Sequence, residues 1–173
     1  TRRLSDASLV RRSQQGDRRA FGALVGRYDA RLRGLAYALL LDPGAMDAAL
    51  SSAYLRAWRD VVRLTAKDDA GAWLYRVTYN ACIDALRRDG DPPPASPHKG
   101  TRAGLASLPP TDRVAVVLVD REGFTPEGAA RILGLPPADF QSRLVAARAT
   151  LAPYLPPPPK PAPAQSEPEA TEA

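Results

Sequence analysis

The chain has 173 residues, of which 24 are Lys or Arg and 19 are Asp or Glu, giving a net charge of +5. A single Cys and a single His exclude an internal disulfide and the three or four protein ligands of a zinc site, and no apolar run is long enough to cross a membrane. No glycine-rich phosphate loop, nucleophile elbow or carboxylate cluster is present either. We therefore expect a cytoplasmic protein without catalytic residues, metal, cofactor or membrane insertion.

The positive charge is concentrated before the carboxy-terminal segment. Residues 152–173 hold one Lys and three Glu, so the rest of the chain carries 23 basic and 16 acidic residues, a net charge of +7. A folded portion this basic favours a polyanion partner such as nucleic acid. Arginine supplies 21 of the 24 basic residues, which suits phosphate binding but is also what a GC-rich genome encodes.

Residues 1–88 are expected to form one all-helical domain, because apolar residues recur there at three- and four-residue steps and no segment alternates like a strand. Ser5, Asp17 and Asp69 stand where N-caps are expected, so three helices should begin after them. A further helix should carry the apolar positions between residues 46 and 61. Asp42-Pro43-Gly44 should end the helix that precedes it.

Pro and Gly concentrate in residues 89–104 and 152–173, which are expected to form a linker and a disordered tail. Residues 105–151 should form a second helical domain, beginning with a short helix around Leu105. Thr111 is expected to cap a helix that ends at Gly123, and Thr125 a brief one that ends at Gly134. A last helix should cover residues 137–151, which completes a helix-turn-helix pattern.

The helix expected over residues 73–88 has a polar face that suits single-stranded nucleic acid. When Leu74, Val77 and Ala81 point inward, helical geometry places the polar side chains on or near the other face. Aromatic rings stack on unpaired bases, guanidinium groups hold phosphates, and an amide reads a base edge. The side chains concerned are Tyr75, Arg76, Tyr79, Asn80, Asp84 and Arg87. The alternative is that the tyrosines only cover the edge of the core while the arginines are solvated.

The helix expected over residues 137–151 is the candidate recognition helix. Arg143 and Arg148 could meet phosphates or base edges in a major groove, and Gln141 could read adenine. Asp139, near the start of the helix, would be repelled by phosphates. A purely structural helical hairpin gives the same pattern, so this alternative stays open.

Several short motifs stand in order along both halves of the chain. In the first half they are Gly16-Asp17-Arg18-Arg19-Ala20-Phe21, Tyr54-Leu55-Arg56-Ala57-Trp58-Arg59 and Trp73-Leu74-Tyr75-Arg76-Val77. In the second half they are Leu108-Pro109-Pro110, Leu133-Gly134 and Ser142-Arg143-Leu144. Taken together, over roughly residues 5 to 151, these motifs resemble the extracytoplasmic-function (ECF) group of bacterial sigma-70-type sigma factors.

This resemblance implies a detachable subunit of RNA polymerase that recognises promoter DNA, with an anti-sigma protein as a further partner. Residues 1–88 would correspond to sigma region 2 and residues 105–151 to sigma region 4. The residues implied to bind core RNA polymerase are Asp47, Tyr54, Leu55, Trp58 and Arg59. Those implied to bind the minus-ten single strand are Tyr75, Arg76, Tyr79, Asn80, Asp84, Arg87 and Arg88. Those implied to bind the minus-thirty-five duplex are Thr125, Gln141, Ser142, Arg143 and Arg148.

Two departures from the family pattern keep a second function open. Several acidic residues are usual where this chain has Asp47, Ala48, Ser51 and Ser52. Around the recognition helix the chain has Pro136, Asp139 and Gln141 where the family often has Ser, Thr and Lys, and Ala146-Ala147 in place of His-Arg. The alternative is a sigma-like interaction module that occupies an anti-sigma partner without starting transcription. A small helical enzyme is the least favoured class, because the sequence shows no set of catalytic residues.

Overall fold

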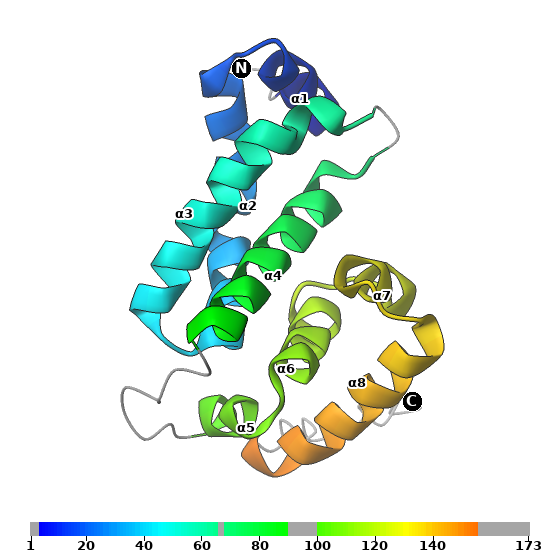
Figure 1. Ribbon diagram of the computed structural model, residues 1–173. Coiled ribbons are helices and arrows are strands. Elements are labelled where there is room, and N and C mark those ends of the chain that lie inside the picture. The colour runs from blue at the N-terminus through cyan, green and yellow to red at the C-terminus, as the bar shows by residue number, and fades with distance from the viewer. Residues whose placement is uncertain (1–3, 66–67, 90–99, 156–173) are drawn as a thin grey trace, which may run out of the picture.

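The computed structural model describes residues 4–65, 68–89 and 100–155, and every regular element in these residues is a helix (Figure 1). The expectation of an all-helical fold is therefore confirmed. The predicted linker and tail fall largely outside the described residues, since residues 90–99 and 156–173 are not among them.

The first half consists of four helices and a short 3-10 turn. Their bounds are α1 Asp6–Gln14, α2 Arg18–Leu40, α3 Pro43–Asp60, η1 Val61–Arg63 and α4 Ala70–Asp89. The three expected caps are present: Ser5 accepts from the Ser8 N–H, Asp17 from Ala20 and Asp69 from Ala72, over 3.0 to 3.3 Å. Each satisfies a backbone N–H that the first helical turn leaves without a partner.

The break between α2 and α3 differs in detail from the prediction. Leu41 ends α2 in the left-handed conformation, with φ of 55°. Asp42 then caps α3 rather than ending α2, because its carboxylate accepts from the Ala45 N–H over 2.7 Å. Pro43 occupies the first turn of α3, where its missing N–H costs no hydrogen bond.

The second half holds α5 Thr101–Ser107, α6 Pro110–Val116, a π-helical turn η2 Val117–Arg121, α7 Pro126–Leu133, α8 Pro137–Leu151 and the 3-10 turn η3 Ala152–Tyr154. Helix α5 begins inside the predicted linker, and η3 lies inside the predicted tail. The reason is packing, since Leu105, Leu108 and Leu151 form a small hydrophobic cluster that joins α5 to the end of α8.

Turn chemistry in the second half follows the sequence with one exception. Gly123 and Gly134 have φ of 76° and 69°, and the Thr125 hydroxyl accepts from the Gly128 N–H over 3.1 Å, as predicted. Thr111 does not cap a helix, because α6 already begins at Pro110 and has no side-chain cap bond. Proline fits this first position of a helix, so the helix starts two residues earlier than a Thr111 cap would place it.

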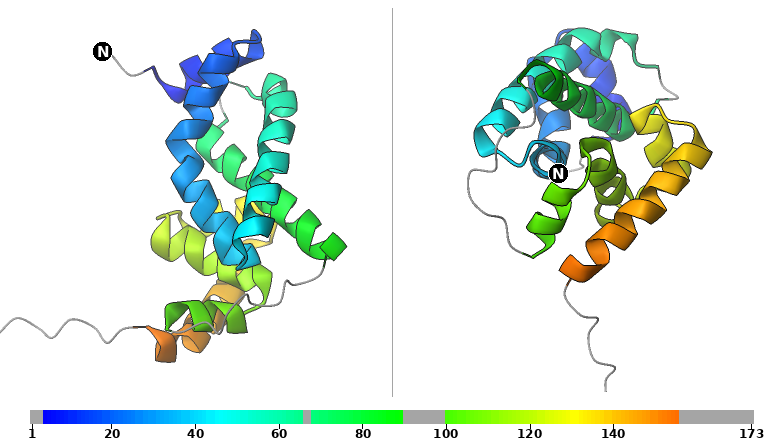
Figure 2. Two further views of the ribbon diagram at one scale, coloured as in Figure 1. Left: turned by 90° about the vertical axis from the view of Figure 1, so that its left-hand side faces the viewer. Right: turned by 60° about the horizontal axis from the view of Figure 1, so that its bottom comes forward.

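The two halves pack against each other around a shared hydrophobic core. Figure 2 shows the second half seated against the first, and α6 contacts α2 while α7 contacts α4. Arg113 of α6 is 4% exposed and donates to the backbone carbonyl of Leu39 in α2 over 2.8 Å. Tyr75 of α4 meets Phe124 edge to face, with ring centroids 5.0 Å apart. These contacts fix the position of α4 relative to the helix-turn-helix.

Candidate nucleic-acid interface

The outward side of α4 presents a ridge of polar side chains. Arg76, Asn80 and Arg87 are exposed and stand four and seven residues apart, so they lie along one line of the helix. Ile83 lies half-buried between them. Arg76 also donates to the backbone carbonyl of Arg131 in α7 over 2.5 Å. Guanidinium and amide groups of this kind can bind phosphates and base edges.

Tyr75 does not lie on this ridge, so the prediction that it faces the solvent is wrong. Its side chain is 1% exposed and its hydroxyl donates to Glu122 Oε2 over 2.6 Å. Burial, and then the bond to Glu122, raise the pKa of the Tyr75 hydroxyl. The second half of the chain covers this tyrosine, which is a tertiary effect that the period of α4 alone could not predict.

Tyr79 lies at the edge of the ridge and is half-buried. Together with Arg87 and Thr111 it lines a wide, open hollow of about 420 Å³ between α4 and the start of α6. A ring beside a guanidinium group in such a hollow is suited to holding a base and its phosphate.

The remaining two predicted strand-binding residues lie at the end of α4. Asp84 accepts from Arg56 of α3 over 2.5 Å, which ties α4 to α3 and occupies its carboxylate. Arg88 is exposed. Asp84 therefore has a structural partner that accounts for its presence without DNA.

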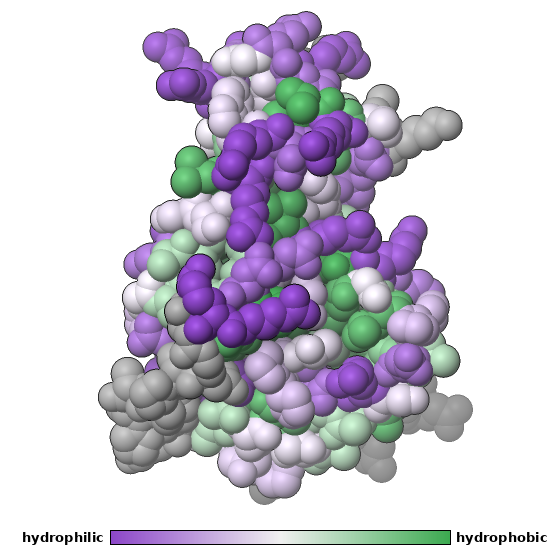
Figure 3. All heavy atoms as spheres, in the orientation of Figure 1, coloured by the Kyte–Doolittle hydropathy of each residue, from purple (hydrophilic) through white to green (hydrophobic). Residues whose placement is uncertain are grey.

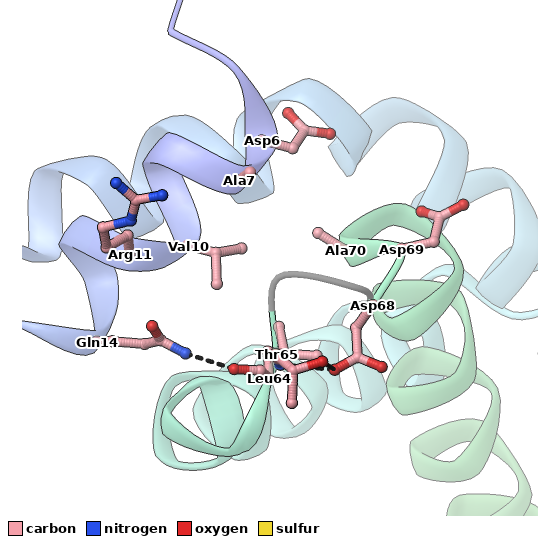
Figure 4. A pocket seen from close by; sticks show the side chains of 10 residues that line it. All are labelled: Asp6, Ala7, Val10, Arg11, Gln14, Leu64, Thr65, Asp68, Asp69 and Ala70. Carbon is pink, nitrogen blue, oxygen red and sulfur yellow. Dashed lines mark hydrogen bonds between the residues drawn. The ribbon is translucent and has the colours of Figure 1, made fainter.

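The segment that leads into α4 is held by α1, as the close view in Figure 4 shows. Gln14 of α1 donates to the carbonyl of Leu64 over 2.7 Å, and Thr65 donates to Asp68 through its backbone N–H and its hydroxyl. The backbone N–H of Thr65 in particular lowers the pKa of the Asp68 carboxyl. These bonds border a pocket of about 210 Å³ and fix where α4 begins.

Helix α3 carries the predicted polymerase-binding residues on two different sides. Leu55, at 63% exposure, and Arg59 lie on its outward face. Trp58 instead packs edge to face on Phe21 of α2, with centroids 5.1 Å apart, and Tyr54 donates to Asp29 of α2 over 2.7 Å. Tyr54 and Trp58 thus join α3 to α2. The carboxylate of Asp47, also exposed, accepts from Arg33 over 2.7 Å.

The helix-turn-helix is formed by α7 and α8, which keep the predicted ranges. Phe140, Leu144, Ala147 and Leu151 anchor α8 in the core. Arg143 donates to Asp112 over 3.1 Å and Arg148 to Asp120, so both predicted DNA-binding arginines have acidic partners on the adjoining elements. Gln141 and Ser142 are exposed, whereas the Thr125 hydroxyl is occupied as the cap of α7.

Hydrophilic side chains cover much of the face formed by α3 and α4, with hydrophobic groups between them (Figure 3).

Within the described residues, no helix is long and apolar enough to span a membrane, and no three His, Cys, Asp or Glu side chains are grouped to bind a metal. Cys82 is buried, and burial raises the pKa of its thiol to about 12, so the thiol stays protonated.

Comparison with known proteins finds a matching protein family for each half of the chain. Residues 24–91 match Sigma-70 region 2, and residues 102–151 match Sigma-70, region 4. The ECF RNA polymerase sigma factor SigM of Mycobacterium tuberculosis H37Rv is 33% identical over 163 residues, which cover 86% of this chain and 83% of SigM. The chain belongs to the ECF sigma factor family. The ECF RNA polymerase sigma-E factor of Escherichia coli K12 is 25% identical over 178 residues, covering 86% of this chain and 93% of that protein.

Two solved structures have the fold of this sigma factor. CnrH, in complex with the cytosolic domain of CnrY, has a TM-score of 0.69 at 26% identity, and the match covers 86% of this chain and 95% of CnrH. RpoE of Bartonella quintana, in complex with the anti-sigma factor NepR, also has a TM-score of 0.69, at 20% identity, covering 78% and 95% of the two chains.

Sequence reasoning missed two residues that organise the site of this sigma factor. Glu122 has a 4% exposed side chain and accepts from Tyr75, with Arg121 and Arg31 nearby at 3.6 and 3.8 Å. Arg113 binds the backbone carbonyls of Leu39 and Leu108, each over 2.8 Å. Charged residues are expected at the surface of a protein. The sequence alone therefore gives no reason to place either residue in the interior.

Proposed function

We propose that this sigma factor directs core RNA polymerase to promoters by binding two DNA elements with its two halves. The α4 ridge of Arg76, Asn80 and Arg87 holds the opened minus-ten strand, and α8 lies in the major groove of the minus-thirty-five duplex. The observation that carries this proposal is the α4 ridge, because two exposed guanidinium groups around one amide, beside the Tyr79 hollow, form a surface for unpaired bases.

The energies of strand capture are compatible with this surface. Unstacking and unpairing a base costs a few kcal/mol, and stacking one base on an aromatic side chain returns roughly 1–3 kcal/mol. Tyr79 supplies such a ring, while Arg76 and Arg87 bind phosphates. Simultaneous duplex binding by α8 raises the effective concentration of α4 at the minus-ten element, so a modest affinity of each half is sufficient.

A second candidate function, an interaction module that binds an anti-sigma partner without starting transcription, is favoured by the surface of α3. Its outward side presents Ala48, Ser52, Leu55 and Arg59, without the acidic patch usual in the family. The two candidates differ in one measurement. Sigma-directed initiation requires that the full chain and core RNA polymerase co-purify, and a pull-down that recovers no polymerase would favour the interaction module.

Replacing Tyr79 with Ala should impair promoter opening more than promoter binding. The variant removes the ring of the Tyr79 hollow but leaves α8 unchanged, so the duplex contacts remain. Permanganate footprinting of the holoenzyme on a promoter should show at least tenfold less reactive thymine in the minus-ten region, which corresponds to about 1.4 kcal/mol of lost stacking. Tyr37→Ala, at a half-buried tyrosine of α2 outside the ridge, serves as the control. Normal opening in the Tyr79 variant would remove Tyr79 from the site.

Replacing Arg143 with Ala should weaken duplex binding by the same factor on every sequence. Its guanidinium reaches Asp112 at one flank of α8, where it is positioned for phosphate rather than for a base edge. We expect the slope of log K against log salt to fall by at most about 1, because one phosphate contact is lost and Asp112 already neutralises part of the charge. Arg18→Ala, at the exposed start of α2, should leave the slope unchanged. A change in sequence preference would contradict the phosphate role.

A further inference from the structure

The outward ridge of α8 carries no charge. With Phe140, Leu144, Ala147 and Leu151 buried, helical geometry places Ala138, Ser142, Val145 and Ala149 opposite them, and all four are exposed. Val145 is the large apolar side chain of this ridge and is 56% exposed. Gln141 stands beside this ridge on the first turns of the helix. A neutral ridge of small and apolar side chains therefore faces whatever α8 binds.

The two arginines of α8 lie on its flanks and are held away from this ridge. Arg143 donates to Asp112 of α6 over 3.1 Å, and the Arg148 Nε donates to Asp120 of η2 over 3.1 Å. In helical projection the two arginines fall on opposite sides of the ridge, so they are placed for the backbones that border a groove. Recognition of guanine commonly needs a guanidinium group aimed at O6 and N7, and the ridge itself offers none.

The chemistry that the ridge does offer is complementary to A·T base pairs. Apolar side chains recognise the C5 methyl group of thymine, and a glutamine amide makes a bidentate contact with adenine N6 and N7. Val145 and Ala138 can supply the first contact and Gln141 the second. Small side chains also let α8 approach the floor of the groove closely, and the first turns of a recognition helix are the part that reads bases.

We propose that α8 reads thymine methyl groups and adenine edges through Val145 and Gln141, so that the upstream element of this sigma factor is rich in A·T pairs. Arg143 and Arg148 hold the flanking phosphates and carry no sequence information. This inference rests on the proposed function, because it requires that α8 binds duplex DNA. A protein partner seated on the same ridge is the alternative, and it predicts that the holoenzyme enriches no upstream duplex element.

The test uses the full chain with core RNA polymerase and a pool of random duplexes. The upstream element that the holoenzyme selects should be rich in A·T pairs. Replacing each selected thymine by deoxyuridine removes only its methyl group, so at least one such replacement should weaken binding about three- to fivefold. In Val145→Ala this deoxyuridine penalty should disappear, and in Gln141→Ala the preference for adenine should relax. Val62→Ala, at a 61% exposed valine of η1, should keep both effects.

The outcomes distinguish this inference from the function on which it rests. Selection of a guanine-containing element with no effect of deoxyuridine would overturn the inference while leaving promoter recognition intact. A deoxyuridine penalty that persists in Val145→Ala would also overturn it, because the methyl group would then be read elsewhere. If no duplex is enriched and no polymerase associates with the chain, the proposed function itself fails. Val145→Ala retains the helix, since Ala has the higher helix propensity and the site is exposed.

Discussion

Replacing Arg113 with Ala should lower the free energy of unfolding by about 2–4 kcal/mol. The guanidinium is buried and donates to the carbonyls of Leu108 and Leu39, so it joins α6 to its own preceding turn and to α2 of the first half. Alanine would leave these carbonyls without donors inside the protein and would leave a cavity in place of the side chain. Urea denaturation monitored by circular dichroism measures the loss.

Two further variants test whether the lost stability comes from the buried Arg113 guanidinium and its two hydrogen bonds. Arg113→Lys keeps the positive charge but cannot reach two carbonyls in the planar geometry of a guanidinium, so it should lose most of the same stability. Arg18→Ala removes an exposed arginine and should change the free energy of unfolding by less than about 0.5 kcal/mol. Equal stability of the Arg113 and Arg18 variants would show that Arg113 does not join the halves.

Replacing Tyr75 with Ala should destabilise the chain by about 3–5 kcal/mol, as expected for a fully buried aromatic residue. Its ring packs on Phe124 and its hydroxyl binds Glu122, so the variant loses core volume and the hydrogen bond from Tyr75 to a buried carboxylate. Tyr75→Phe keeps the ring and should lose about 1–3 kcal/mol, the cost of removing the hydroxyl that donates to Glu122. Thermal unfolding of both variants separates packing from the hydrogen bond. A Tyr75→Ala variant as stable as the wild type would contradict the buried position.

The Tyr75–Glu122 contact also predicts how stability depends on alkaline pH. Burial and the bond to Glu122 raise the pKa of Tyr75 in the folded chain, whereas in the unfolded chain it titrates near its ordinary pKa of about 10. The unfolded state therefore releases its proton first, so this stabilisation is complete below about pH 10 and is lost as the pH rises above it. Tyr75→Phe should lose less stability than the wild type between about pH 10 and 11. If the free energy of unfolding fell equally with pH in Tyr75→Phe and in the wild type, the pKa of Tyr75 would not be raised by folding.

Local signals in the sequence predict the helices well because each helix start is determined by neighbouring residues. Asp17 and Thr125 each accept a backbone N–H three residues ahead, which requires no knowledge of the rest of the fold. The prediction for Thr111 was wrong because a proline competed for the same helix start. The short helix around Leu105 was predicted, but its start at Thr101, inside the predicted linker, was not, since that turn is stabilised by packing on Leu151 of α8.

The candidate site could be predicted only where its residues face the solvent. The spacing of Arg76, Asn80 and Arg87 determines that they share one side of α4, whatever packs on the other side. Tyr75 lies on the flank that the second half covers, and its partner Glu122 is 47 residues away in the chain. A periodic pattern in one helix does not reveal such a long-range partner. The acidic partners of Arg143 and Arg148 escaped prediction for the same reason.

Transcription in vitro tests the central claim most directly. Core RNA polymerase is mixed with the full chain and a library of genomic fragments, and transcripts are mapped to their start sites. The account predicts starts that appear only when the chain is added and share an element upstream of the opened region, and Asn80→Ala on the α4 ridge should reduce these transcripts. If the chain adds no start from any fragment while it still binds core polymerase, promoter recognition by α4 and α8 is contradicted.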